Sequence, residues 1–303
     1  GSLGLPIIPL FEQNAALEQA PKIVKGMLAD PAISKAMTLK WGRHLEVMVG
    51  YSDSAKETGV LKSRLAIARS IHELDQIFKK TDAIPVFFHG SGGSTDRGGG
   101  SIEEQPAWWP ESALKLYKAT LQGETIERSL ASPEITRRRL EQIALRLTGP
   151  HDRRKPGVYR PGEALELFAE KASAEYRAKI ADPAFLEIVQ HATAYRYLSD
   201  LRLGSRPAKR GKVLSVQALR AIPWVLCWTQ TRVLFPTWWG IGTAWEKMRA
   251  SDKEKLKADA KTDPLFSSYL KILASALSRV ALPSVPSICV ISSMRCNGTS
   301  GRT

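Results

Sequence analysis

Residues 84–100 read IPVFFHGSGGSTDRGGG, and this stretch decides the expected fold. It opens with the β-branched and aromatic residues of a buried strand and then stops in a glycine tract. Glycines permit close backbone approach, and Arg97 offers a planar set of donors, so the tract suits a phosphate or a carboxylate. It matches neither the P-loop nor the dinucleotide-binding glycine pattern. The spacing alone leaves an anion site and a solvated loop equally open.

The sequence around this stretch alternates strand-like runs with helical periodicity. Strand-like runs are predicted at residues 5–11, 45–51, 84–89, 117–122 and 222–228. Helices are predicted at residues 14–28, 60–80, from 133 onward, 162–203 with a break at Asp182-Pro183, 243–260 and 265–280. Repeated strand, crossover and strand units indicate a parallel sheet in an α/β protein that is mainly helical. A (β/α) barrel and an open sheet both fit this order.

Composition changes divide the chain into three predicted regions. Residues 1–149 carry most of the strand-like runs and the glycine tract. Residues 150–282 open with a Pro/Gly/basic linker and continue as a helical insertion with the last strand-like run. Residues 283–303 have no helical period and are predicted to be disordered or to derive from a shifted reading frame.

The composition limits the classes of partner and compartment. The 303 residues carry a net charge of +14, which suits phosphorylated metabolites or nucleic acid, or simply a solvated basic surface. The basic clusters lack the aromatic interleaving typical of a single-strand binder. Three cysteines without metal-ligand spacing favour a reducing compartment, and no apolar run reaches the roughly 18 residues of a membrane span. We therefore expect a cytoplasmic protein that binds neither membrane nor nucleic acid.

Polar residues follow the strand-like runs, where barrel enzymes place their chemistry. Glu12 closes the first run and Asp53 follows the second, so two carboxylates at one mouth are expected to hold Mg²⁺ or Mn²⁺. The alternative is that each carboxylate caps a helix. Lys56 is either a cation of the same mouth or a solvated helix residue. His89 alone fits a structural histidine as well as a catalytic one.

Five motifs in order carry a family resemblance: VMVGYSDSAKETG (47–59), FFHGSGGSTDRGGG (87–100), QGETIERSLASPEI (122–135), LGSRPAKR (203–210) and LRAIPWVLCWTQTR (219–232). Together they resemble phosphoenolpyruvate carboxylase. The resemblance runs from about residue 7 to about residue 280 but covers only the central and later part of a longer family sequence. We therefore expect a fragment.

The resemblance implies a cytoplasmic enzyme that is mainly helical, built on a TIM-type (β/α) barrel, and dependent on Mg²⁺ or Mn²⁺. This chain would then hold a partial barrel with additional helices. The family converts phosphoenolpyruvate and bicarbonate to oxaloacetate and phosphate through carboxyphosphate and a metal-bound enolate. It also implies a homo-oligomer, a tetramer in the full-length family, and inhibition by aspartate or malate.

The motif matches assign roles residue by residue. Glu12, by match to PLFE (9–12), and Asp53, by match to GYSDSAK (50–56), resemble the metal ligands. His89, Arg97 and Lys56 resemble catalytic residues of the mouth. Substrate binding is implied for Arg206, Arg220 and Gln122, and effector binding for Arg97 and Arg279.

Two departures from the family pattern limit the expected activity. Ser91 stands where the commonest family form of the glycine loop has arginine. The family's catalytic histidine motif lies upstream of the residues present, so we expect this chain alone to have absent or very weak activity. The alternatives are a noncatalytic metabolite-binding or interaction module and, third, a nucleic-acid binder.

Overall fold

The computed structural model describes residues 3–92, 105–121, 123, 126–127, 130–148, 159–200 and 221–280. Its centre is a parallel sheet with the strand order β1-β2-β3-β4. The strands are β1 (Leu10–Phe11), β2 (His44–Gly50), β3 (Ile84–Gly90) and β4 (Lys118–Ala119). The register places Phe11, Val49, His89 and Ala119 in one row across the sheet. Residues that follow the strands therefore meet at one edge.

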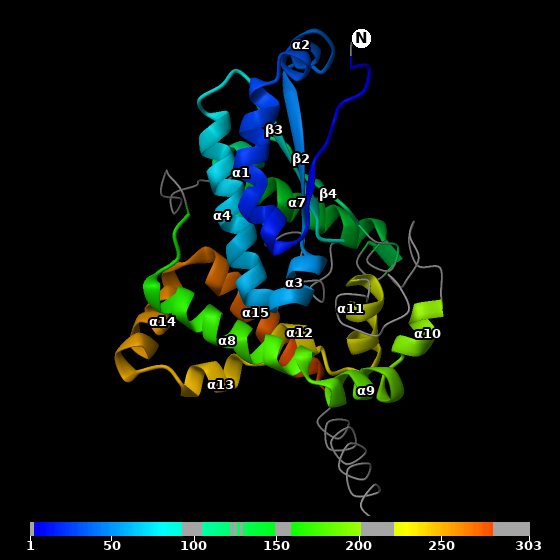
Figure 1. Ribbon diagram of the computed structural model, residues 1–303, viewed down its shortest axis with the longest axis vertical. Helices are drawn as coiled ribbons and strands as arrows, with labels where there is room; N and C mark the ends of the chain where they lie inside the picture. Colours follow the sequence, from blue (N-terminus) through cyan, green and yellow to red (C-terminus); the bar gives the residue numbers. More distant parts are fainter. Residues whose placement is uncertain are drawn as a thin grey trace, which may run out of the picture.

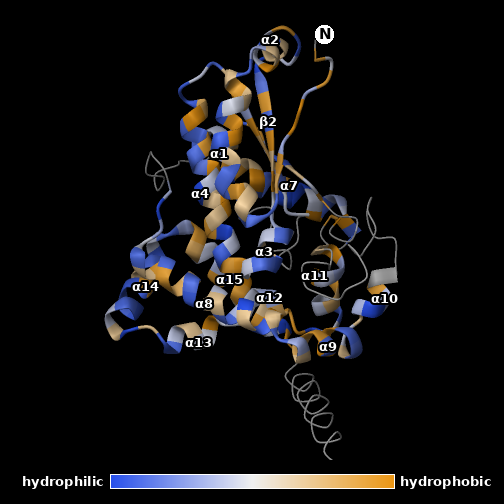
Figure 2. Ribbon diagram, in the orientation of Figure 1, coloured by the Kyte–Doolittle hydropathy of each residue, from blue (hydrophilic) through white to orange (hydrophobic). Residues whose placement is uncertain are grey.

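Helices cover one face of this sheet. They are α1 (Asn14–Ala29) and α4 (Val60–Phe78), which run side by side along the strands (Figure 1). The shorter helices α2 (Pro31–Lys40) and α3 (Ser52–Thr58) lie at opposite ends of the sheet (Figure 1). Hydrophobic and hydrophilic positions alternate around both long helices (Figure 2). Leu45, Val47 and Val49 point to this face and are buried. Parallel strands bury apolar side chains under such crossover helices.

The remaining elements lie below the sheet in Figure 1 or behind it. They are η2 (Gln105–Trp108), α5 (Glu111–Leu114), α7 (Pro133–Thr148), α8 (Glu163–Ala181), α9 (Pro183–Ala192), α10 (Tyr195–Asp200), α11 (Ala221–Gln230), α12 (Phe235–Trp238), α13 (Ile241–Glu246), α14 (Ala250–Thr262) and α15 (Pro264–Arg279). None of the helices that the structure describes combines the length and hydropathy needed to cross a membrane.

Three helices begin at an Asp-Pro pair, which is a local start signal in the sequence. The side chains of Asp30, Asp182 and Asp263 each accept a hydrogen bond from a backbone N–H in the first turn of the helix that follows. Proline then occupies the first helical position, where its missing N–H costs nothing. The predicted break between two helices at Asp182-Pro183 is thus confirmed.

Two hydrophobic clusters form the core. One joins the covered face of the sheet to α1, α4, α8 and α15. The other is mostly aromatic and lies between α8, α9, α11 and α12, with Trp224, Trp228 and Phe235 in mutual ring contact. Because α8 contributes to both clusters, it connects the sheet to the helices that follow it.

The mainly helical α/β prediction is confirmed, and three finer predictions are corrected. Residues 222–228 lie in helix α11, because Trp224 and Trp228, four residues apart, face the same cluster. Within residues 5–11, only Leu10–Phe11 pairs as a strand. The helix predicted at 243–260 divides into α13 and α14, with Arg249 as the residue before the second helix.

Candidate functional site

The chain after β1 is held against the end of β2. A Cβ atom added to Gly50 would lie 2.4 Å from Cβ and 2.9 Å from Cα of Glu12. These distances are too short for any side chain at position 50, so glycine is required for this close approach. Glu12 therefore lies at the carboxyl edge of the sheet, beside the end of β2.

The start of α1 binds α3. The side-chain nitrogen of Asn14 donates to Glu57 Oε2 at 2.8 Å and to the Ser54 carbonyl at 3.3 Å. Asp53 precedes Ser54 in the first turn of α3. The segments after β1 and β2 thus run together, which brings Glu12 and Asp53 to the same edge.

Lys56 lies in the interior beside this pair. Its side chain is 5% exposed, and Nζ is 3.5 Å from Oδ1 of Asp53. The hydroxyl of Tyr176 donates to the Lys56 carbonyl at 2.9 Å and fixes the backbone of α3. A buried ammonium group needs a charged partner nearby. The alternative of a solvated Lys56 is therefore wrong, and the lysine adds positive charge to the edge.

His89 is fully buried at the end of β3. Its ring stacks on Trp109, with ring centroids 3.6 Å apart and planes 6° from parallel. Its Nδ1 is 2.8 Å from the hydroxyl of Tyr51. Burial removes the water that would solvate an imidazolium and lowers the pKa of His89 to about 3. The ring is therefore neutral at physiological pH.

The beginning of the glycine tract is anchored at the same edge. Gln105 Nε2 donates to Oγ of Ser91 at 2.9 Å, and both side chains are fully buried. The N–H of Gly92 donates to Oγ1 of Thr120, the residue after β4, at 2.9 Å. At position 91, where the family resemblance leads one to expect arginine, a neutral buried pair takes its place.

The carboxylates of Glu12 and Asp53 fit a hard divalent cation. Mg²⁺ prefers oxygen ligands and is often held by one or two carboxylates, with water and substrate oxygens completing the shell. Within the described part of the chain, no group of three or more histidine, cysteine or acidic side chains is placed to bind a metal. Glu12 and Asp53 would supply two carboxylate ligands to a cation here, and water or substrate oxygens would complete its shell.

Four predicted site residues lie outside the described residues: Arg97, Gln122, Arg206 and Arg220. Arg279 lies in the last turn of α15, where its Nε donates to the Ser275 carbonyl at 3.0 Å. The roles of these five residues stay predictions.

Cys227 is buried, and burial raises the pKa of its thiol to about 12, so Cys227 carries no nucleophilic thiolate near neutral pH.

Sequence reasoning missed Tyr51 and Trp109, which hold His89 from two sides. Tyr51 lies within the motif at 47–59, but the motif assigns it no role of its own. Trp109 does belong to the core cluster, but it also stacks on a polar ring. The available signal is the pair Trp108-Trp109 that follows the glycine tract, since large aromatic side chains bury much apolar surface and are expected to pack.

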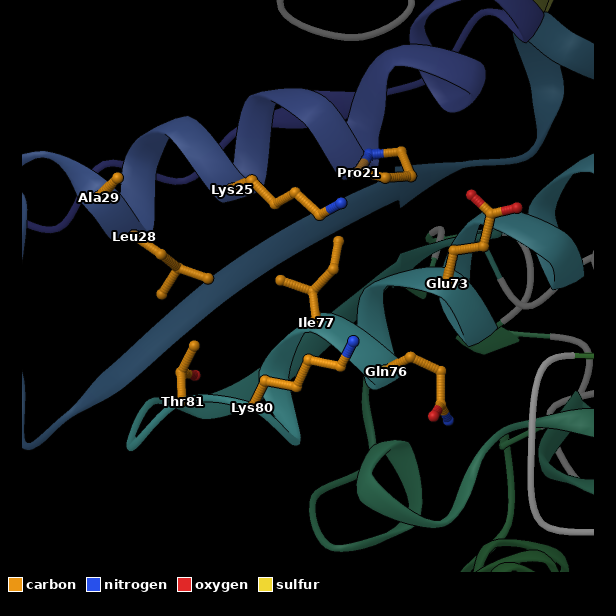
Figure 3. A pocket seen from close by; sticks show the side chains of 9 residues that line it. All are labelled: Pro21, Lys25, Leu28, Ala29, Glu73, Gln76, Ile77, Lys80 and Thr81. Atoms are coloured by element: carbon orange, nitrogen blue, oxygen red, sulfur yellow. The ribbon is translucent and has the colours of Figure 1, made fainter.

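A separate cavity of about 600 Å³ lies between α1 and α4, away from the carboxyl edge (Figure 3). We call it the α1/α4 groove, and it is lined by Pro21, Lys25, Leu28, Ala29, Glu73, Gln76, Ile77, Lys80 and Thr81. Lys25 and Ile77 reach toward each other across it (Figure 3). Thr81 leads into β3, and Ala29 ends α1, so the groove lies toward the amino ends of the strands.

Comparisons with known proteins agree with the motifs. The sequence profile of the family described as phosphoenolpyruvate carboxylase matches residues 1–284. A phosphoenolpyruvate carboxylase of Thermus thermophilus is 35% identical over 286 residues, which cover 91% of this chain and 32% of that relative. The corresponding protein of Picea abies is 34% identical over 264 residues, covering 83% and 26%. That of Chromohalobacter salexigens is 35% identical over 291 residues, covering 92% and 32%. The chain spans about a third of the length of the relatives it matches.

Proposed function

Since the chain belongs to the phosphoenolpyruvate carboxylase family, we propose that it forms part of the active site that converts phosphoenolpyruvate and bicarbonate to oxaloacetate and phosphate. The observation that carries the proposal is the meeting of Glu12, Asp53 and His89 at one edge of a parallel sheet. The proposal concerns part of the catalytic apparatus, because the chain spans about a third of its relatives.

We propose further that the sheet belongs to a TIM-type barrel. Three features support this: the strands are parallel and in sequential order, helices cover one face, and the candidate residues follow the carboxyl ends. On the other face, Glu46 and Met48 are half-buried, and Lys118 Nζ lies 2.7 Å and 2.8 Å from the two Glu46 oxygens.

Glu12 and Asp53 would hold Mg²⁺ or Mn²⁺. When bound, the cation supplies positive charge that stabilises the developing enolate oxygen and orients the substrate. Lys56 lies beside Asp53 and adds a second positive charge in a site with little water. Electrostatic stabilisation is strongest in such a dry and preorganised site.

The chemistry assigned to the other residues follows from their types. Phosphoryl transfer from phosphoenolpyruvate to bicarbonate gives carboxyphosphate and the enolate of pyruvate. Carboxyphosphate then releases phosphate and CO₂, and the enolate carbon attacks CO₂ to form oxaloacetate. Arg206 and Arg220 would bind the phosphate, and Gln122 would line the mouth. Arg97, on the glycine tract, would bind substrate and exclude the water that would protonate the enolate.

The wider setting follows from the same family membership. We propose a cytoplasmic homo-oligomer in which Arg97 and Arg279 bind an inhibitory aspartate or malate. The inhibitor is a dicarboxylate, and arginine binds carboxylates with two parallel hydrogen bonds. The assignment of Arg97 rests on the glycine-tract motif, and that of Arg279 rests on the family resemblance alone.

Titration of Mn²⁺ into the 303-residue chain tests the proposal. We expect Glu12→Gln and Asp53→Asn each to weaken Mn²⁺ binding at least tenfold, because each removes a charged ligand. Glu73→Gln, in the α1/α4 groove, is the matched control and should leave binding unchanged. In the same samples, bound Mn²⁺ should accelerate the relaxation of the ³¹P signal of phosphoenolpyruvate.

Undiminished Mn²⁺ binding by Asp53→Asn would show that Asp53 is not a metal ligand. Mn²⁺ binding without any effect on the ³¹P relaxation of phosphoenolpyruvate would show that phosphoenolpyruvate does not bind beside the metal in this chain. Because this chain alone is expected to have absent or very weak activity, the test rests on Mn²⁺ binding and ³¹P relaxation and not on formation of oxaloacetate.

A further inference from the structure

The hydrogen bond between Tyr51 and His89 is isolated from water. Both side chains are almost fully buried, and the Tyr51 hydroxyl is 2.8 Å from Nδ1 of His89. The second ring nitrogen of His89, Nε2, is also buried and has no hydrogen-bond partner among the described residues. Buried polar atoms without partners are rare in proteins, so this nitrogen requires an explanation.

The position of the proton on His89 follows from counting partners. In a neutral imidazole one nitrogen carries a proton and the other accepts one. If the Tyr51 hydroxyl donates to Nδ1, only the Nε2–H is left without a partner. If Nδ1–H donates to the Tyr51 oxygen, both the tyrosine proton and the Nε2 lone pair are left without partners. Each unpaired buried group costs free energy, so donation by Tyr51 is the favoured arrangement.

We propose that Tyr51 is a positioning residue that holds His89 as the neutral Nε2–H tautomer, so that His89 presents one buried N–H donor to an anionic substrate oxygen. The identity of the substrate, bicarbonate, rests on the proposed function. The tautomer rests only on the contacts of Tyr51 and His89.

The surroundings of His89 support a fixed donor rather than a proton-transfer group. The stack on Trp109 sets the plane of the ring, and Trp109 is itself stacked on Tyr117 at 5.3 Å. Burial keeps the ring neutral, as its lowered pKa shows. Nε2 lies on the other side of the ring from Nδ1 and therefore points away from Tyr51. A substrate oxygen at this position would supply the missing partner.

Nitrogen-15 NMR of the chain labelled at its five histidines tests the tautomer directly. Protonated and unprotonated ring nitrogens differ widely in ¹⁵N chemical shift, and His89→Gln identifies the His89 signals by their loss. We expect a protonated Nε2 and an unprotonated Nδ1 in the unmodified chain. In Tyr51→Phe, the Nδ1–H form should become populated, because the donor to Nδ1 is gone.

Tyr269→Phe is the matched control, because it removes another fully buried hydroxyl, one that donates to the Thr237 carbonyl at 2.9 Å. It should leave the His89 signals unchanged. A protonated Nδ1 in the unmodified chain would overturn the proposal even if Tyr51→Phe fails to fold. An unchanged tautomer in a folded Tyr51→Phe chain would overturn the role of Tyr51.

Addition of bicarbonate with Mg²⁺ separates this inference from the proposed function. We expect the Nε2–H signal of His89 to shift as the donor gains an acceptor. If the tautomer is as expected and the signal does not move, the role of Tyr51 stands, and the assignment of bicarbonate to His89 is wrong.

Discussion

The two ends of the sheet use polar side chains in opposite ways. At the carboxyl edge, His89 and Ser91 are fully buried, Lys56 is nearly so, and each contacts a specific neighbour. In the α1/α4 groove, toward the amino ends, Lys25 and Lys80 are exposed to solvent. The groove is lined by solvated side chains, whereas the carboxyl edge holds the fixed and dry groups that catalysis requires. Burial and pairing of polar side chains therefore mark the candidate site.

The largest expected effect is the loss of stability in Trp109→Ala. The indole stacks on His89, contacts Trp108 edge-on and is 1% exposed, so its removal leaves a cavity under the site. We expect the free energy of unfolding to fall by about 3–5 kcal/mol, as for other large aromatic residues in cores. Urea unfolding measures this change as a lower midpoint.

Ile77→Ala, in the α1/α4 groove, is the comparison variant. Its side chain is only half-buried, so the loss of stability should be clearly smaller. Equal losses for the two variants would mean that the carboxyl edge is no better packed than the groove, and the contrast between the two ends would fail.

The second prediction concerns the pH dependence of stability. His89 has a pKa of about 3 in the folded chain and about 6.5 when exposed, so between these values the unfolded state binds more protons. Its contribution to stability is complete above pH 6.5 and is lost as the pH falls toward 3. We expect a slope of up to about 1.4 kcal/mol per pH unit from this residue.

Urea unfolding of His89→Gln at several pH values isolates this contribution, because the carboxylates titrate in both chains. The variant should lose less stability than the unmodified chain between pH 6.5 and pH 4.5. His44→Gln, at an exposed histidine that begins β2, is the control and should keep the full slope. Parallel pH profiles for the unmodified chain and His89→Gln would show that His89 is not a buried neutral ring.

The sequence predicts the strands that form the carboxyl edge better than it predicts the segment at residues 222–228. The strands that begin near Leu45 and Ile84 are predictable because each run of β-branched and aromatic residues ends at a turn signal. Their carboxyl ends are expected to meet because the strands are parallel. The strand prediction for residues 222–228 is wrong, because a short apolar run fits a buried strand and a buried helix equally well. Tertiary packing of Trp224 and Trp228 decided between them.

Within the site, sequence reasoning placed Glu12, Asp53 and His89 at the strand ends, but it could not place their supports. Tyr51 and Trp109 contact His89 only after the chain folds, and no periodic pattern records a contact across 38 residues, the separation of Tyr51 from His89. The pair of Ser91 and Gln105 is of the same kind. Such contacts join residues that are far apart in the sequence, and strand and helix propensities do not record them.

The third prediction uses glycine to compare the two ends. Gly50→Ala would place Cβ 2.4 Å from Cβ of Glu12, so the chain after β1 must move. We expect a loss of about 1–3 kcal/mol, the usual cost of overpacking. Because Glu12 moves with the chain, Mn²⁺ binding should weaken as well. Unchanged stability together with unchanged Mn²⁺ affinity would show that Glu12 is not held against Gly50.

The smallest expected effect is a gain of stability in Gly26→Ala. Gly26 lies in α1 next to Lys25 of the α1/α4 groove, and a Cβ atom added there meets nothing within 4 Å. Alanine restricts the unfolded chain and favours the helix, so the free energy of unfolding should rise by about 0.5–1 kcal/mol. Mn²⁺ affinity should not change, because the groove is separate from the carboxyl edge. Paired urea unfolding of Gly26→Ala and Gly50→Ala gives the sharpest contrast, since the same substitution should stabilise one end and destabilise the other. A loss of stability in Gly26→Ala would mean that position 26 packs against another part of the chain and is not open to solvent.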